Sequence, residues 1–220
     1  MADVSVAGFP GFPAEAYEFY EGLQADNSKT YWTARKDVYE RDVKAPMQAL
    51  LEALAPDFGL GKLFRPYRDV RFSSDKSPYK THQGVFCQTA DGVGYYVHLD
   101  AEGVYVAGGF YSHTRDQTAR YRSAVDDDKT GPQLVRITSA LTKKGFAIGG
   151  DMVKTRPRGC PADHPRLELM RHESLTAGRY LEASPKLATA AGLALVRTQW
   201  TAMRPLVEWV MTNVGGGTDD

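Results

Sequence analysis

Apolar and polar residues alternate with helical periodicity in the first part of the chain. The segment 14–24 predicts a short helix, and a second helical stretch begins after Asn27-Ser28, which can cap it, and runs towards Ala55. Because Pro46 lies inside this stretch, we expect the helix to kink or to restart there. The positions expected to face the core at helical spacing are Val43, Met47, Leu50, Leu51 and Leu54.

The helical periodicity ends after Leu63. The segment 64–72 lacks helical periodicity, which indicates extended chain. In a strand, its side chains would alternate between two faces. Beyond a turn rich in Ser, Asp and Pro, three runs rich in Val, Tyr or Phe are separated by short turn sequences. They span 84–88, 94–100 and 103–111. This pattern predicts an antiparallel β-meander.

Helical patterns return in the second half of the chain. We expect helices to begin near Thr114 and near Thr130, strands within 146–155 and 174–182, and a last helical region after Ser184-Pro185. Helices, then a run of strands, then helices are typical of an α+β fold.

The organisation expected from these patterns is one domain over residues 14–212. In it, an antiparallel β-meander packs against N-terminal and C-terminal helices. Residues 1–13 are predicted to form a flexible leader, and residues 213–220 a disordered tail after the Gly-rich end of the last helix.

The charge balance limits the classes of partner. The 220 residues carry 27 Lys and Arg against 27 Asp and Glu, so any basic patch must be local. The N-terminus has no signal-peptide pattern, and no window approaches the ~20 apolar residues of a membrane span. Cys87 and Cys160 lie far apart without metal-site spacing. These features predict a cytoplasmic protein with no membrane partner.

A dense run of charged, hydroxyl and aromatic residues between Phe64 and His82 is the strongest candidate for a binding site. Arg donates in two-pronged fashion to carboxylate or phosphate and Lys adds a compact charge, so we expect the run to bind a small anion. Asp69 and Asp75 would orient the cations, and Tyr79 would donate a hydrogen bond. The cations are Arg65, Arg68, Arg71, Lys76 and Lys80.

Two other interpretations of this run stay open. In one, its aspartates pair with neighbouring cations and only pin a turn, which makes the run architectural. In the other, interleaved aromatic rings stack on the bases of a single-stranded nucleic acid while the cations meet its phosphates. The aromatic residues concerned are Tyr67, Phe72 and Tyr79.

A second basic cluster lies on the loop that follows residue 155. It comprises Arg156, Arg158 and His164, on a loop punctuated by proline and glycine. If this loop faces the first cluster, Arg158 and His164 join the ligand-binding residues. The alternative is a solvated basic loop beside a capped helix.

The chain lacks the common catalytic and metal-binding patterns. No two of its five histidines have HxxxH or HxH spacing, and no carboxylate-rich cluster accompanies them. His98 is expected on a strand face, and Cys87 in an apolar stretch as a buried thiol. Neither GxSxG nor a phosphate-binding or dinucleotide-binding glycine pattern occurs. The sequence predicts no metal and no cofactor, and it leaves open whether the protein is an enzyme.

The central run contains Arg68 to Ser73, then Asp75-Lys76, then Pro78 to Thr81. This order of residues resembles the signature of the Domain of Unknown Function 2461 family of bacterial and fungal proteins. The chain departs from the family pattern at Tyr31-Trp32, where the family has a Trp-Phe pair, and at Cys160, where it has an aromatic residue. The resemblance extends over nearly the whole chain and implies no activity, substrate or catalytic residue. The further matching positions are Asn27, Trp32, Lys36, Tyr39, Gly108-Gly109, Pro157-Arg158-Gly159 and His164-Pro165.

Overall fold

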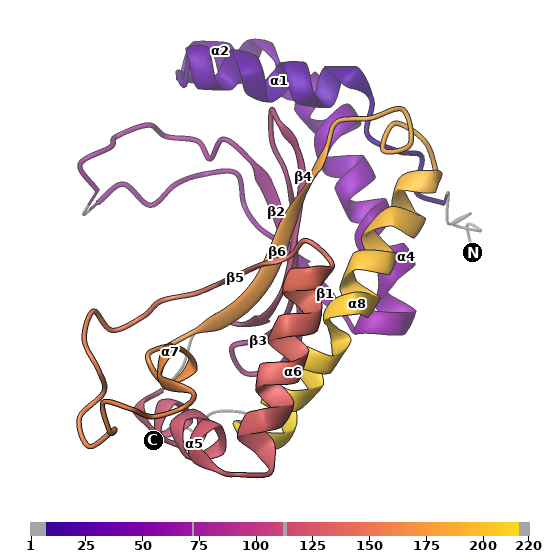
Figure 1. Ribbon diagram of the computed structural model, residues 1–220. Helices are drawn as coiled ribbons and strands as arrows, with labels where there is room; N and C mark the ends of the chain where they lie inside the picture. The colour runs from indigo at the N-terminus through magenta and orange to yellow at the C-terminus, as the bar shows by residue number, and fades with distance from the viewer. Residues whose placement is uncertain (1–7, 72, 112–113, 216–220) are drawn as a thin grey trace, which may run out of the picture. The chain divides into compact units, whose positions relative to one another are not determined.

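The computed structural model describes residues 8–71, 73–111 and 114–215 (Figure 1). Its helices are α1 (Ala14–Ala25), α2 (Lys29–Ala34), α3 (Lys36–Val38), the π-helical turn η1 (Tyr39–Lys44), α4 (Ala45–Phe58), α5 (Arg115–Asp126), α6 (Thr130–Lys143), α7 (Leu167–Met170) and α8 (Ala191–Asn213). Its strands are β1 (Gly61–Leu63), β2 (Gln83–Ala90), β3 (Val93–Leu99), β4 (Gly103–Phe110), β5 (Ala147–Gly149) and β6 (Leu175–Glu182).

The strands form one six-stranded antiparallel sheet in the order β1-β2-β3-β4-β6-β5. The consecutive neighbours β2, β3 and β4 are the predicted meander. β1 joins its edge with Lys62 opposite Phe86, and β5 joins the other edge with Ile148 opposite Ala177. The sheet and its helices confirm the predicted α+β class.

The chain divides into two compact units. Unit 1 comprises Met1–Cys87, Tyr96–Tyr105 and Tyr180–Thr198. Unit 2 comprises Gln88–Tyr95, Val106–Arg179 and Gln199–Asp220. The predicted limits of a single domain at residues 14 and 212 stay a prediction.

Aromatic rings fill the core of unit 1. The ring of Trp32 lies 4.7 Å from that of Tyr39 and 5.7 Å from that of Phe19. It also stacks on Tyr79, with centroids 4.3 Å apart and planes 6° apart. Edge and offset contacts of this kind add about 0.5–1.5 kcal/mol each to the free energy of burial. The helices α1 and α2 are therefore joined to the charged run through its Tyr79.

Residues 8–13 belong to this core as well. Phe9 and Phe12 are buried, and the Phe12 N–H donates to the carbonyl of Leu187 at 2.8 Å. The described part of the predicted leader is thus packed, because two large apolar side chains gain more by leaving water than the segment loses in freedom. The rest of that prediction, residues 1–7, lies outside the described residues, as do residues 216–220 of the predicted tail.

The long helical stretch begins as predicted and accommodates its proline. The Ser28 hydroxyl caps α2 by accepting the Tyr31 N–H at 3.1 Å. The π-helical turn η1 then leads into α4, with Pro46 in its first turn. Proline has no N–H to donate, and the first turn of a helix needs none. The backbone stays helical from η1 into α4, and the helix type changes just before Pro46.

The segment 64–71 lies outside the named strands, so it is extended chain, as expected, without regular strand pairing. Its ladder is reduced to one bridge, between Tyr67 and Tyr79. Past that bridge the carboxylate of Asp69 accepts the Arg71 N–H at 3.3 Å, and that of Asp75 accepts the Ser77 N–H at 2.9 Å. Side chains that bond the local backbone in this way replace strand pairing.

Unit 2 is organised by capped helices. Thr114 and Gln117 form a reciprocal capping box at the start of α5, as its sequence indicates. The Trp209 indole N–H of α8 donates to the carbonyl of Thr130 at 3.1 Å, which joins α8 to α6. α8 begins at Ala191, later than the predicted start after Ser184. Among the described helices none is long and apolar enough to cross a membrane.

Phe12→Ala tests the packing of the segment before α1. Phe12 is fully buried, so we expect the free energy of unfolding to fall by about 3–5 kcal/mol. Leu60→Ala removes an apolar side chain that is 87% exposed and should change it by no more than about 0.5 kcal/mol. Urea denaturation measures both. Equal effects of the two variants would contradict the packing of this segment.

Candidate functional site

Polar and aromatic side chains gather on one face of the sheet in unit 1. In β3, Val97 and Leu99 are buried on one side, whereas Tyr96 and His98 are half-buried on the other. This follows from the two-residue period of a strand. We call the resulting surface the His–Tyr face. It consists of His82, Tyr96, His98, Asp100, Tyr105 and Tyr180.

Hydrogen bonds link four of these side chains in a chain. The Tyr180 hydroxyl donates to Asp100 Oδ2 at 2.7 Å. His98 Nε2 lies 3.2 Å from the same Oδ2, and His98 Nδ1 lies 3.1 Å from the Tyr96 hydroxyl oxygen. These partners assign the proton of a neutral His98 to Nε2, with Tyr96 donating to Nδ1. Both nitrogens of His98 are therefore engaged within the protein.

A glycine makes room for this arrangement. A Cβ at Gly84 would lie 2.8 Å from the Tyr96 hydroxyl and 3.1 Å from the ring of Phe64. The missing side chain lets Tyr96 lie over β2 and reach His98.

Asp100 is the charged centre of the chain of hydrogen bonds. Burial opposes its ionisation, but hydrogen bonds from His98, Tyr180 and the Glu102 N–H outweigh burial and lower its pKa to about 2. The side chains of His98 and Asp100 are 14% and 13% exposed. Burial and the bond to Asp100 raise the pKa of Tyr180 well above its ordinary value. The face thus carries a fixed carboxylate surrounded by hydroxyl donors.

His82 lies beside this network without taking part in it. Its ring centroid is 4.8 Å from that of His98. Burial, and then repulsion from His98 and Lys80, lower its pKa from 6.5 to about 4. In the part of the chain that the structure describes, its ring nitrogens have no hydrogen-bond partner. His82 is therefore neutral near pH 7 and available to a ligand.

Lys80 and Arg65 add positive charge next to His82. Lys80 Nζ lies 5.3 Å from the centroid of the Phe64 ring. Burial, and then repulsion from Arg65, lower the pKa of Lys80. Among residues 8–71, 73–111 and 114–215, no carboxylate forms an ion pair with either cation. Burial and neighbouring cationic groups thus oppose the charge of Lys80 and a proton on His82, and an anion would relieve this.

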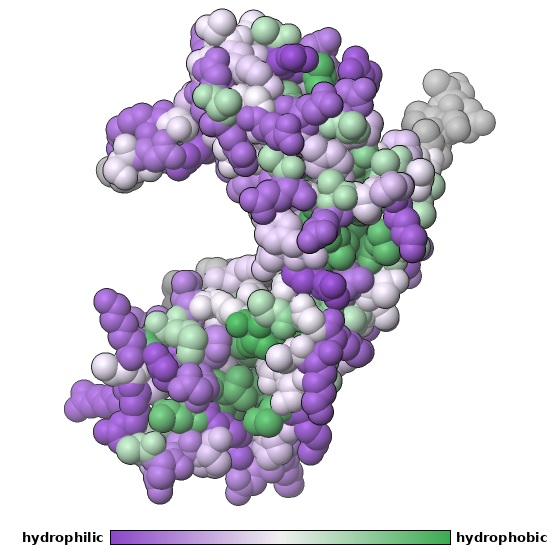
Figure 2. Space-filling model, turned by 45° about the horizontal axis from the view of Figure 1, so that its top comes forward, coloured by the Kyte–Doolittle hydropathy of each residue, from purple (hydrophilic) through white to green (hydrophobic). Residues whose placement is uncertain are grey.

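The other charges of the central run have partners close by in sequence. Arg68 pairs with Asp75, and Arg71 Nη2 lies 2.7 Å from Asp69 Oδ2. Lys76 Nζ donates to the carbonyl of Val70 at 2.9 Å. Figure 2 shows this segment as a mainly hydrophilic lobe.

Local hydrogen bonds also hold Asp75 in its charged form. Its Oδ1 accepts the Ser77 hydroxyl at 2.6 Å and the Ser77 N–H at 2.9 Å. These bonds, with the further bond from Arg68, lower the pKa of Asp75 to about 2. The side chains of Asp69 and Asp75 orient Arg71 and Arg68, as the sequence indicates.

Tyr79 is a packing residue in the structure. It is 5% exposed and stacks on Trp32. Asn27 brackets its backbone, since Asn27 Nδ2 donates to the Tyr79 carbonyl at 3.0 Å and Asn27 Oδ1 accepts the Tyr79 N–H at 3.1 Å. Further along, the Tyr39 hydroxyl donates to Gln83 Oε1 at 2.6 Å. Residues 79–83, which carry Lys80 and His82, are thus held at both ends.

The second predicted cluster belongs to unit 2. Arg158 is exposed on its loop, and no hydrogen bond of its side chain occurs within the described ranges. His164 is largely enclosed: its Nε2 lies 3.0 Å from Asp126 Oδ1, and its Nδ1 accepts the Arg166 N–H at 3.1 Å. A joint site of these residues with the central run stays a prediction.

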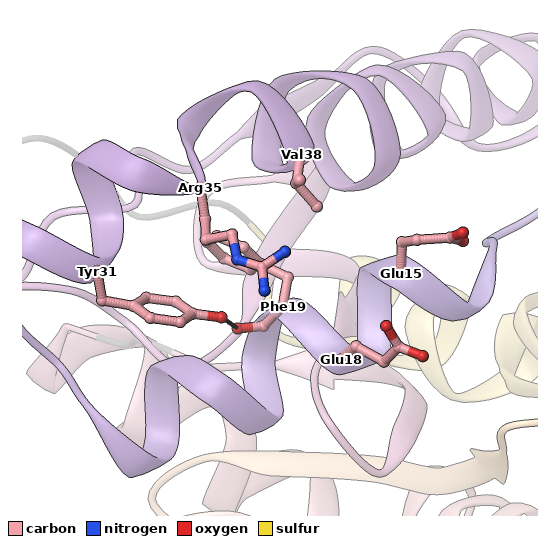
Figure 3. Close-up of a pocket in the computed structure, with 6 residues that line it drawn as sticks. All are labelled: Glu15, Glu18, Phe19, Tyr31, Arg35 and Val38. Carbon is pink, nitrogen blue, oxygen red and sulfur yellow. Dashed lines mark hydrogen bonds between the residues drawn. The ribbon is translucent and has the colours of Figure 1, made fainter.

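Figure 3 shows a separate small pocket of unit 1, between α1 and the helices that follow it. Its volume is about 60 Å³, which is room for about two water molecules. The carboxylates of Glu15 and Glu18 and the guanidinium of Arg35 stand around it on exposed side chains. With mixed charge and little depth, it is a weaker candidate than the His–Tyr face. Its remaining lining residues are Phe19, Tyr31 and Val38.

In the described ranges, no three His, Cys, Asp or Glu side chains lie together as a set of metal ligands. Both cysteines are buried free thiols, and burial raises the pKa of Cys87 to about 11. The site residues therefore offer cation, imidazole and hydroxyl donors, which suit an anion.

These features define a class of protein: an α+β fold in which a central charged run leads into a face of histidine and tyrosine side chains. The family described as "Conserved hypothetical protein (DUF2461)" matches residues 15–209. The chain belongs to this family, which confirms the resemblance seen in its motifs. A comparison with curated proteins returns no match.

The sequence did not point to the His–Tyr face. His98 was expected only as a strand-face residue, and nothing connected it with Tyr180, 82 residues further on. The available signal was the alternation of Tyr96 and His98 with the apolar residues of β3. A half-buried histidine on such a face needs a polar partner.

His82→Asn tests the environment of His82 through stability. Because its pKa is about 4 in the folded protein and 6.5 when unperturbed, the unfolded chain binds more protons between these values. The wild-type free energy of unfolding should therefore rise from pH 4 to pH 6.5 by more than that of His82→Asn, and the two curves should run parallel above pH 7. Urea denaturation at several pH values measures this. Parallel curves throughout would contradict a buried, neutral His82.

Asn27→Ala tests the anchoring of residues 79–83. The substitution leaves the backbone groups of Tyr79 without their partners, so we expect a loss of about 1–3 kcal/mol in the free energy of unfolding. Limited proteolysis should cut the segment 64–80 faster. Gln48→Ala, which removes only an exposed bond to Glu52, is the control and should leave both measurements nearly unchanged. An unchanged cleavage rate in Asn27→Ala would argue against the anchor.

Proposed function

We propose that unit 1 binds a small molecule with a phosphate or carboxylate group at the His–Tyr face, where Arg65, Lys80 and His82 receive the negative charge. One observation carries the proposal: Lys80 and His82 are half-buried, Arg65 opposes the charge of Lys80 and Lys80 opposes a proton on His82, and none of the three forms an ion pair in the described part of the chain. Proteins seldom keep such a cluster without a use for it, and perturbed groups of this kind gather at functional sites.

The surroundings favour a small ligand. The hydroxyl of Tyr180, which is 43% exposed, lies at the edge of the face and can donate to an anion only by leaving Asp100. The half-buried rings of Phe64, beside Lys80, and of Tyr105, stacked on His98, suit an apolar part of the ligand. The His98–Asp100 pair holds the face in shape.

The central run then has two tasks. Arg68, Asp69, Arg71, Asp75 and Lys76 shape the projecting lobe by their mutual bonds, and residues 79–83 present the ligand groups. In this proposal the lobe touches the ligand only at the rim of the site.

We place the protein in the cytoplasm as part of the same proposal. The support is that both cysteines are free and buried, which fits a reducing compartment. No cofactor is invoked.

Single-stranded nucleic acid is the second candidate ligand. Tyr67 is 50% exposed next to Arg68, so it is able to stack on a base. Tyr79 is enclosed against Trp32 and is not available for stacking, and Phe72 lies outside the described residues. With one accessible ring, this candidate has less support than the small anion. The burial of Tyr79 also supports the interpretation in which the central run only stabilises the fold.

Ligand-induced stabilisation tests the proposal. Phosphate, pyrophosphate and citrate should raise the melting temperature in a concentration-dependent way, because a ligand that binds only the folded state stabilises it by mass action. Lys80→Gln should weaken binding about tenfold or more, since a charge-assisted contact contributes about 1.5–3 kcal/mol. Lys44→Gln removes the same charge at an exposed pair with Glu40 and should leave binding unchanged.

Arg71→Gln separates the face from the lobe. The substitution should leave anion binding nearly intact; a loss as large as that of Lys80→Gln would move the ligand to the lobe. No stabilisation by any of the three anions would overturn the proposal. Retention on single-stranded oligonucleotides with a steep loss of affinity in salt would favour the second candidate.

A further inference from the structure

The two histidines of the His–Tyr face differ in their hydrogen bonds. Both ring nitrogens of His98 are engaged, by Tyr96 on one side and by Asp100 and Tyr180 on the other. Neither nitrogen of His82 has a partner among the residues that the structure describes, although the ring is half-buried. The ring of His82 thus keeps two nitrogens that no group of the described residues uses, and a ligand can bind them.

We infer that His82 donates a hydrogen bond to the bound anion as an imidazolium, so that each anion enters the site together with one proton. This inference rests on the proposed function and identifies the residue that makes the site selective for oxyanions. The proton comes from the solvent and is added to a ring nitrogen, and no other bond forms or breaks.

The charges that face His82 support this coupling. Lys80, from the same segment, and His98, from β3, disfavour a proton on its ring, while Asp100 at the end of β3 favours one. Burial adds to the two unfavourable effects, and the pKa of His82 falls to about 4. Without a ligand the ring is neutral near pH 7.

An anion reverses this balance. Its negative charge would lie within reach of Lys80 and His82, and a nearby opposite charge favours the protonated form of a histidine. The linkage is reciprocal: if the anion raises the proton affinity of His82, a proton on His82 raises the affinity for the anion by the same factor. Affinity should therefore fall with rising pH, by up to tenfold per pH unit, above the pKa of the free protein and below that of the complex.

The preferred ligand follows from this chemistry. An imidazolium and an ammonium are both donors without an acceptor, so they suit a fully ionised oxyanion and disfavour one that still carries its own proton. Phosphate monoesters as dianions and sulfate esters meet this requirement. A neutral hydroxylated molecule does not.

Inorganic sulfate is the sharper probe for the experiment, because phosphate monoesters titrate near pH 6 whereas sulfate stays ionised. Calorimetric titrations of the wild-type chain at pH 5.5, in buffers of different ionisation enthalpy, report the number of protons taken up. Chloride keeps the ionic strength constant. We expect an uptake approaching one proton for each sulfate bound, and an affinity that decreases as pH rises from 5 to 7.

His82→Asn is the matched variant, since its amide keeps a donor and cannot take up a proton. We expect sulfate binding to become weaker and independent of pH over this range, with an uptake near zero. Histidine NMR of the wild type gives a second reading that needs no variant: the pKa of His82 should rise when sulfate is added.

The outcomes separate this inference from the proposed function. Sulfate binding without proton uptake, an uptake that persists in His82→Asn, or a His82 pKa that sulfate does not move would each refute the inference and leave the anion site standing. If neither sulfate, phosphate nor citrate binds at any pH, the proposed function fails first.

Discussion

The amide of Asn27 and the ring of Trp32 hold Tyr79, and the site of unit 1 depends on that hold. Asn27 satisfies both backbone groups of Tyr79, and Trp32 covers its ring. Because side chains alternate along an extended segment, fixing Tyr79 towards the core turns Lys80 to the other side. One polar clamp between distant parts of the sequence thus determines where the unpaired charge of the central run lies.

Charge in the central run is divided between two environments. In the lobe, Arg68 and Arg71 have carboxylates within the same segment, and exposed pairs of this kind add little to stability. At the His–Tyr face, Lys80 and His82 are half-buried and lack such partners. Desolvation makes the second environment costly for the folded protein and receptive to an anion. The position of a charge, more than its number in the motif, therefore decides what it can do.

Local physics explains which elements were predictable. The meander, the start of α5 at Thr114 and the place of Pro46 in the first turn of α4 follow from periodicity, a side-chain cap and a missing N–H, all of which act within a few residues. For the extended segment 64–71 the pattern did not decide whether it pairs as a strand, because the aspartates compete for its backbone N–H groups. Proline and glycine around Phe9 and Phe12 suggested a flexible leader. In the structure both side chains are buried in the core of unit 1.

The sequence by itself determined the α+β class, the order of most elements and the family, and it predicted a ligand site in the central run. Only the tertiary structure decided which cations of that segment are paired, and that His82, His98, Asp100 and Tyr180 share one face. The reason is physical. Secondary structure follows from patterns within a few residues, whereas burial and the pairing of charges depend on neighbours that the fold brings from far along the chain.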